Sequence, residues 1–329
     1  MAAGNINISQ RARWFMLTTL LTFSLGSACF AGPATQRYVY IASQEGNTVS
    51  TIDVQTNKVV SRIGVPEKPV FIAVTSDGSS AYVTHPDLAR ISVLDLNKGS
   101  VVAEYHFSGE PFAATLSSDE ASLFVSDWKG NAVVRIDVQN GKETGRISVG
   151  SAPAGLTLDP ACRRLYVADR GSAAVSVIDA IAWKSLYRVP VGASPFALAA
   201  HDGQIYVANV KDNTLSRLET ESRHETWRVK MEAMPYGVAI TPDGRQAWVT
   251  AQQKGMLQRI DTDGTVVRPG IKVGRYPEGV VIADGRAYVA LWFDDKVAVV
   301  DLATGQVSKK IDVDAGPRIV ATRSLCKKQ

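Results

Sequence analysis

The chain has 329 residues, of which 36 are lysine or arginine and 32 are aspartate or glutamate, so its formal net charge is only +4. Such a balance excludes a generic attraction to DNA or to anionic lipid. Only three cysteines and four histidines are present, which leaves few residues for a clustered metal site.

The N-terminus has the pattern of an export signal. Arg11 and Arg13 precede an apolar run over residues 14–25, and small residues follow it. A basic start, a short apolar core and small residues before a cleavage point are typical of a signal peptide. We therefore predict a signal peptide over residues 1–31, cleavage after Ala31, and bacterial Sec-type export to the periplasm or beyond.

Two alternatives stay open at this terminus. Cleavage could follow Ala28, and Cys29 could be lipidated, although Gly26 stands where a lipidation motif normally has leucine. No other stretch approaches the ~18 apolar residues that a membrane-spanning helix needs. The mature chain is therefore expected to be water-soluble.

The remainder of the chain is a repeat with a period of 40 or 42 residues. A proline, an aromatic residue and an acidic residue mark each copy. The prolines are Pro69, Pro111, Pro153, Pro195, Pro235, Pro277 and Pro317; the aromatic residues are Tyr40, Tyr82, Phe124, Tyr166, Tyr206, Trp248 and Tyr288; the acids are Asp53, Asp95, Asp137, Asp179, Glu219, Asp261 and Asp301. Because the three series advance by the same steps, the chain is predicted to contain seven repeats.

Each repeat holds four short apolar runs separated by polar turns. This pattern predicts an all-β fold, a seven-bladed β-propeller of four-stranded antiparallel blades over residues 37–322, followed by a tail of residues 323–329. The repeats begin with three strands and end with a single strand at residues 318–322. We expect that strand to complete the first three into the last blade, because this closure removes two unpaired sheet edges.

The repeats also resemble those of a known family. Tyr82-Val83-Thr84 and its variants Tyr166-Val167-Ala168, Trp248-Val249-Thr250 and Tyr288-Val289-Ala290 are similar to the YVTN signature. The sequence Val-Ser-Val-Ile-Asp at residues 175–179 and the Val149-Gly150-x-x-Pro153 joint are similar to the same repeats. The resemblance spans residues 38–322 and implies an exported seven-bladed propeller. It says little about function, because propellers carry many activities.

The recurrent acid precedes a turn in every repeat. Such a carboxylate accepts hydrogen bonds from the N–H groups of the turn, so we predict a structural role rather than a metal or acid–base site. The four histidines fall in four different repeats with no companion at ligand spacing. We therefore predict no metal site and no cofactor.

The loops at one end of the blades depart most from the repeat. They carry aromatic and basic residues, and the joints that follow each outer strand add Phe112, Phe196 and Glu278 to the same face. Because variable loops on a rigid frame carry specificity, we predict that a ligand or partner docks there. The candidate binding residues are His85, Trp128, Lys129, Arg170, Tyr236, Arg275, Trp292 and Arg318.

The favoured hypothesis is a non-catalytic binding or scaffolding module, monomeric, whose partner is a small molecule or a periplasmic protein. In it the aromatic residues supply contact area, and Arg170 with Arg275 holds a carboxylate or phosphate. A different hypothesis is a lactonase-like hydrolase, for which His85, Arg170, Arg275 and Glu278 are the available residues.

Two further alternatives come from the family resemblance. YVTN-like propellers are associated with single-stranded DNA and with periplasmic quinoprotein systems. Nucleic acid is not expected here, because acidic residues match the basic ones on the loop face. An accessory role beside a redox enzyme would rest on protein–protein docking.

Cys162 and Cys326 remain after signal removal. Each lies nine residues after a repeat proline, which places them at the same site of two nearly opposite blades. Since a disulfide joins Cα atoms less than about 7 Å apart, we expect them unbridged unless the C-terminal tail leaves its blade and crosses the face.

Overall fold

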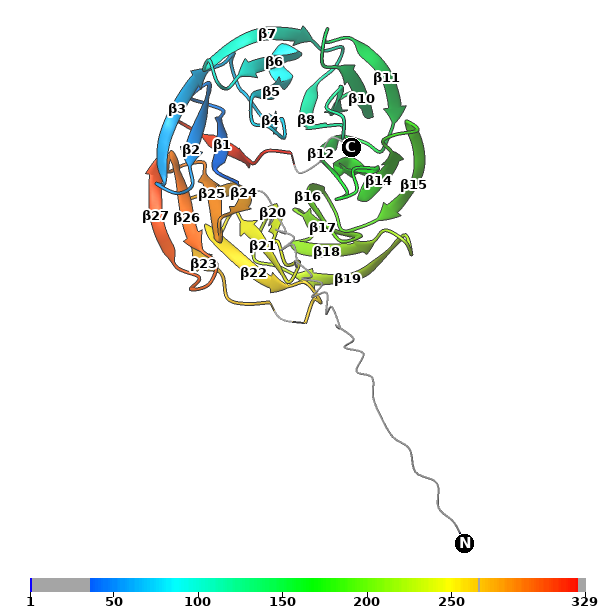
Figure 1. The fold of residues 1–329 in the computed structure, drawn as a ribbon, viewed down its shortest axis with the longest axis vertical. Helices are drawn as coiled ribbons and strands as arrows, with labels where there is room; N and C mark the ends of the chain where they lie inside the picture. The colour runs from blue at the N-terminus through cyan, green and yellow to red at the C-terminus, as the bar shows by residue number, and fades with distance from the viewer. Residues whose placement is uncertain (2–35, 266, 325–329) are drawn as a thin grey trace. The chain divides into compact units, whose positions relative to one another are not determined.

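The computed structural model describes residue 1, residues 36–265 and residues 267–324. Its sheets are seven four-stranded antiparallel blades arranged in a ring (Figure 1). This confirms the predicted fold class. The predicted signal peptide with its cleavage points lies outside the described residues.

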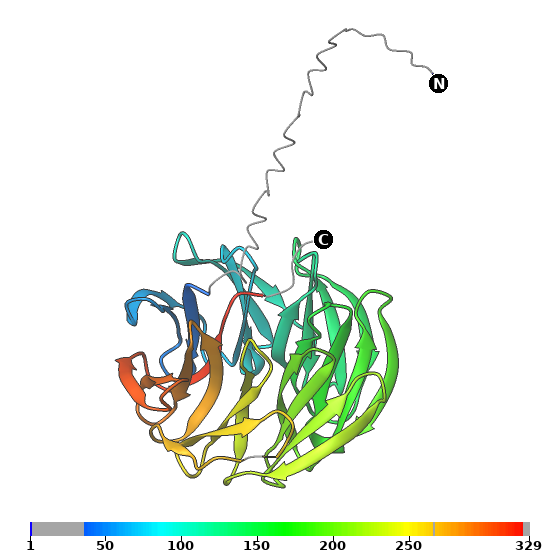
Figure 2. The ribbon, with the colours of Figure 1, turned by 60° about the horizontal axis from the view of Figure 1, so that its bottom comes forward.

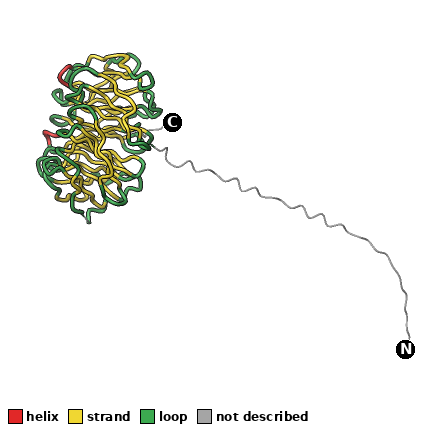
Figure 3. Tube along the Cα trace, turned by 90° about the vertical axis from the view of Figure 1, so that its left-hand side faces the viewer, coloured by secondary structure: helices red, strands yellow, loops and turns green. Residues whose placement is uncertain are grey.

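The blades are numbered here in chain order, each with its inner strand first. Blade 1 consists of β4 (Phe71–Val74), β5 (Ser80–His85), β6 (Arg90–Asp95) and β7 (Ser100–His106), and blade 2 of β8 (Pro111–Leu116), β9 (Ser122–Asp127), β10 (Ala132–Asp137) and β11 (Glu143–Ser148). Blade 3 consists of β12 (Pro153–Leu158), β13 (Arg164–Asp169), β14 (Ala174–Asp179) and β15 (Lys184–Pro190), and blade 4 of β16 (Pro195–His201), β17 (Gln204–Asn209), β18 (Thr214–Glu219) and β19 (His224–Lys230). Blade 5 consists of β20 (Pro235–Ile240), β21 (Gln246–Ala251), β22 (Met256–Asp261) and β23 (Ile271–Lys272), and blade 6 of β24 (Pro277–Ala283), β25 (Arg286–Leu291), β26 (Lys296–Asp301) and β27 (Val307–Asp312). Blade 7 consists of β28 (Pro317–Ala321), β1 (Tyr38–Ser43), β2 (Thr48–Asp53) and β3 (Lys58–Gly64). Helix in the described part of the chain is limited to two 3₁₀ turns, Pro86–Leu88 and Arg170–Ser172 (Figure 3).

The ring closes as predicted. β28 pairs antiparallel with β1, with Ile41 opposite Val320 and Ala42 opposite Ile319. The last strand of the chain thereby becomes the inner strand of blade 7, next to the first strands (Figure 2). Since both ends of the ring are paired, neither leaves an open sheet edge.

The aromatic marker forms the core between blades. It lies in the second strand, where every residue after the first is buried, and the seven marker side chains are all buried. Tyr82, for example, packs in one cluster with Leu116 and Leu123 of the next blade. Burying a side chain of this size contributes about 2–3 kcal/mol, so the same residue stabilises each blade interface.

The repeated acid caps the turn that follows it. Asp53 Oδ1 accepts hydrogen bonds from the N–H groups of Gln55 and Thr56 at 3.0 and 2.9 Å. One repeat later, Asp95 Oδ1 accepts the N–H groups of Asn97 and Lys98 in the same way. These bonds hold the pKa of both carboxyl groups below the ordinary value. The predicted structural role is confirmed for these turns.

The expectation of an unbridged Cys162 is wrong. Cys162 is disulfide-bonded, and the other two cysteines of the chain, Cys29 and Cys326, lie outside the described residues. The chain after β28 does leave its blade, because Arg323 pairs with Val74 of blade 1. That departure is the condition under which the sequence allowed a bridge.

No helix in the described part of the chain is long and apolar enough to cross a membrane.

Candidate active site at the channel mouth

One side chain from each blade meets at the axis of the ring. It belongs to the residue that follows the repeat proline, at the start of the inner strand. These seven residues, named here the channel ring, are Val70, Phe112, Ala154, Phe196, Tyr236, Glu278 and Arg318. In blades 2 to 6 the strand register shifts between the proline and the third residue after it. Such a bulge re-aims the side chain between them.

Four members of the channel ring touch one another in a closed loop. The guanidinium carbon of Arg318 lies 5.6 Å from the centroid of Phe112, and Phe112 meets Phe196 edge-to-face at 5.7 Å. Phe196 packs on Tyr236 at 4.1 Å, and Arg318 Nη2 donates a hydrogen bond to the Tyr236 hydroxyl at 3.1 Å. Three of these contacts join blades that are not neighbours. They are possible only across the axis, so the loop surrounds the mouth of the channel.

Glu278 is the one carboxylate in the channel ring. Its side chain is 7% exposed, its Oε1 accepts a 3.0 Å hydrogen bond from Gln252 Nε2, and its Oε2 lies 3.6 Å from Arg318 Nε. Burial raises the pKa of Glu278 to about 7, although Arg318 and the hydrogen bond from Gln252 act in the opposite direction. A carboxyl group with this pKa exchanges protons near neutral pH.

The backbone of Glu278 is fixed by the neighbouring blade. The Thr250 hydroxyl donates to the carbonyl oxygen of Glu278 at 2.7 Å and accepts the N–H of Gly237 at 2.7 Å. A Cβ on Gly237 would lie 2.4 Å from the same carbonyl oxygen. Two residues therefore let the blades approach closely enough to position Glu278. They are Thr250, the hydroxyl residue of the Tyr-Val-Thr signature, and Gly237, at the third position of the inner strand.

A second layer of side chains covers the channel ring from the loops after the second strands. Trp128 packs on Phe112 with centroids 4.8 Å apart, and the Arg170 guanidinium lies 5.6 Å from the Trp128 centroid. Gln44 Oε1 accepts a 2.8 Å hydrogen bond from Arg318 Nη1. The aromatic contacts thus lie on one side of the mouth, and the polar contacts lie on the Arg318 side.

Four of the predicted binding residues belong to this assembly: Trp128, Arg170, Tyr236 and Arg318. His85 has different surroundings. His85 is buried at the end of β5, where its Nδ1 lies 3.0 Å from the Glu67 carbonyl oxygen and its Nε2 3.0 Å from Ser92 Oγ. Burial lowers the pKa of this histidine. His85 thus stands directly before the Pro86–Leu88 turn, but its side chain is buried in the blade.

The remaining predicted residues lie outside the channel ring. Arg275 is exposed and is held by Asp294, with Nε 2.5 Å from Oδ1. Lys129 is exposed, and Trp292 is half-buried with its backbone N–H bonded to the Tyr276 carbonyl oxygen at 3.1 Å. Arg275 therefore does not join Arg170 in a clamp. The sequence signal that points most directly to the channel ring is the residue after each repeat proline, because the identity of this residue changes from repeat to repeat.

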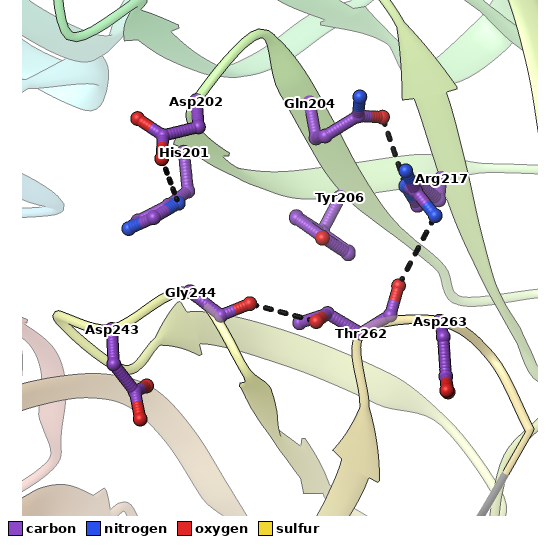
Figure 4. A pocket seen from close by; sticks show the side chains of 9 residues that line it. All are labelled: His201, Asp202, Gln204, Tyr206, Arg217, Asp243, Gly244, Thr262 and Asp263. Carbon is purple, nitrogen blue, oxygen red and sulfur yellow. Dashed lines mark hydrogen bonds and ion pairs between the residues drawn. The ribbon is translucent and has the colours of Figure 1, made fainter.

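A polar cavity of about 320 Å³ lies at the opposite ends of the inner strands of blades 4 and 5. Its walls include His201, Tyr206 and Asp243 (Figure 4). Arg217 crosses it, bonded to Gln204 Oε1 at 2.8 Å and to the Thr262 carbonyl oxygen at 3.3 Å. Its charged groups are thus bonded to each other and to turns.

No protein-family model matches the chain, and no curated protein matches it. Solved structures do. A putative 6-phosphogluconolactonase from Bacteroides fragilis is 15% identical, with a TM-score of 0.74 over 89% of this chain and 99% of that one. Hydrazine synthase from Kuenenia stuttgartiensis is 20% identical, with a TM-score of 0.71 over 80% and 92%. A streptogramin B lyase is 18% identical, with a TM-score of 0.65 over 79% and 92%.

At these identities the likeness shows the fold alone. The chain is a seven-bladed β-propeller. These three similar structures carry the names of enzymes, and this finding contradicts our expectation of a non-catalytic binding or scaffolding module.

Proposed function

We propose that the chain is a hydrolase that opens a cyclic ester, a lactone, at the mouth of the axial channel. The observation that carries this proposal is Glu278, a buried carboxylate whose pKa is raised to about 7 beside the Arg318 guanidinium. Hydrolysis of an ester needs a base to activate water and a positive group to stabilise the oxyanion. The names of two similar structures, both putative 6-phosphogluconolactonases, add support.

The two groups divide the reaction between them. Water attacks the lactone carbonyl carbon while the Glu278 carboxylate accepts one of its protons. The Arg318 guanidinium donates hydrogen bonds to the oxyanion that forms. The ring C–O bond then breaks, and Glu278 returns the proton to the departing alkoxide, which leaves an open hydroxy acid. Charge and protons balance, and the glutamate is restored.

Two amides position these groups. Gln252 donates to Oε1 of Glu278 at 3.0 Å, which leaves Oε2 without a hydrogen bond and directs proton transfer to that atom. Gln44 accepts from Nη1 of Arg318 at 2.8 Å. Both residues hold the reacting side chains at a fixed angle, and neither touches the substrate in this scheme.

The proposal is tested with a panel of five- and six-membered lactones in a pH-stat assay. We expect hydrolysis whose kcat/KM rises with pH through about 7, because the ionised form of Glu278 is the base. Glu278→Gln is expected to lower kcat by 100-fold or more, since general base catalysis contributes about 10²–10⁴-fold. Glu221→Gln, an exposed glutamate in a turn, is the matched control. Failure to hydrolyse any lactone, or full activity of Glu278→Gln, would refute the proposal.

We also propose that the chain is a YVTN-like propeller exported to the periplasm. The signal pattern at residues 1–31 and the Tyr-Val-Thr repeats support this assignment. The test is expression of the full chain in a Gram-negative host, followed by fractionation and N-terminal sequencing. Mature protein that starts near Gly32 in the periplasmic fraction is expected, and full-length protein confined to the cytoplasm would contradict export.

A further inference from the structure

We infer that the lactone carries an apolar arm, an acyl chain or aryl group, which lies along a row of aromatic side chains at the channel mouth. This inference rests on the lactone hydrolysis proposed above and assigns its substrate class. The row consists of Trp128, Phe112, Phe196 and Tyr236, with neighbouring centroids 4.1–5.7 Å apart.

The row is an accessible apolar surface next to the reacting groups. All four side chains are only partly buried, although each contacts its neighbours. The row ends at Tyr236, whose hydroxyl accepts a hydrogen bond from Arg318 at 3.1 Å. A lactone ring bound at Arg318 and Glu278 would therefore place a ring substituent against Phe196 and Phe112. Apolar side chains that keep part of their surface accessible next to reacting groups favour an apolar ligand.

The two channel-ring residues on either side of Phe112 are small or apolar. Val70 is buried beside Phe112 in the ring order, and Ala154 stands between Phe112 and Phe196. Because alanine is small, the two phenylalanine rings reach each other across it at 5.7 Å. Four consecutive members of the channel ring thus carry no polar side chain. These four channel-ring side chains offer no hydrogen bond to a sugar or a phosphate.

The polar half is unsuited to a phosphorylated substrate. Arg318 is the single cation of the channel ring, and its Nη1 and Nη2 each already donate one hydrogen bond, to Gln44 and to Tyr236, while its Nε faces Glu278. The two N–H groups that remain can serve the single oxyanion of a lactone. A phosphate group requires a free bidentate donor or several cations. Ionised Glu278 would also repel the dianion. The substrate therefore differs in class from a phosphorylated sugar lactone, although two similar structures are putative 6-phosphogluconolactonases.

The inference is tested with a homologous series of γ-lactones whose side chain grows from none to about eight carbons. Each methylene buried against the row should raise kcat/KM about fourfold, until the row is filled. Phe196→Ala and Trp128→Ala, prepared separately, should each reduce this increase with chain length. Leu186→Ala is the control, because Leu186 is an exposed side chain on β15, the outer strand of blade 3. Its dependence on chain length should match that of the native protein.

A binding measurement separates this inference from the proposed reaction. Glu278→Gln protein is titrated with cyclic ethers that carry the same side chains and cannot be hydrolysed, and tryptophan fluorescence and calorimetry follow binding. Affinity that rises with chain length supports the apolar arm even if no lactone is turned over. Lactone hydrolysis that is indifferent to chain length, or fastest with a phosphorylated sugar lactone, would overturn the inference while the hydrolase proposal stands. Affinity of the ethers that is unchanged by both aromatic substitutions would overturn it as well.

Discussion

Glu278→Gln should change the pH dependence of stability as well as catalysis. The pKa of Glu278 is about 7 in the folded protein against an ordinary value of 4.5, and this difference corresponds to about 3 kcal/mol. Because the folded pKa is raised, the stabilising contribution is complete below about pH 4.5 and is lost as the pH rises through about 7. Glutamine resembles the neutral acid, so the variant should not suffer this loss.

The measurement is the free energy of unfolding from urea titrations at several pH values between about 4 and 9. Relative to the native protein, Glu278→Gln should have similar stability at the acidic end. At the alkaline end it should be more stable by up to about 3 kcal/mol. Contributions from the other carboxyl groups cancel in the difference between the two proteins. Glu221→Gln, in an exposed turn, should show no such trend. A difference that is independent of pH, or that favours the native protein at high pH, would refute the assigned environment of Glu278.

Three further predictions concern the contacts that build the site. Thr250→Val should lower the free energy of unfolding by about 2–4 kcal/mol, because it leaves a buried N–H and a buried carbonyl oxygen without partners. Thr250→Ser keeps the hydroxyl and should stay near the native value. Equal denaturation midpoints for the two variants would contradict the bridge that the Thr250 hydroxyl forms between the blades. Gly237→Ala should cost about 2 kcal/mol and lower kcat for any lactone, because its Cβ would meet the Glu278 carbonyl oxygen at 2.4 Å; unchanged melting and activity would argue against that close approach. Deleting residues 317–329 removes the inner strand of blade 7 and should give insoluble or unfolded protein, so a soluble product with the native melting curve would disprove closure by β28.

The repeat made the fold predictable because its evidence is local. Proline, aromatic residue and acid each serve one blade or one turn, and the same physical role recurs in every copy. The missing inner strand at the start and the single strand at the end also fixed how the ring closes. The repeat did not show that the His85 side chain is buried, because its contacts with Ser92 and the Glu67 carbonyl oxygen depend on how the strand and the preceding joint pack.

The candidate site was predictable only in part. Trp128, Arg170, Tyr236 and Arg318 were marked by their departure from the repeat. The sequence placed them on one face, but it did not show which of them touch one another; Arg275, placed on the same face, pairs with Asp294. Cys162 shows the same limit, because its position in the repeat did not show that it is disulfide-bonded.

By itself, the amino-acid sequence determined the number of blades, the register of their strands, and the turns that join them. These features depend on residues a few positions apart or in adjacent strands. Only the tertiary structure decided which side chains share the axis. Contacts such as Arg318 with Phe112 and Tyr236 join non-neighbouring blades, and they form only after seven inner strands have closed into a ring narrow enough for side chains to meet across it.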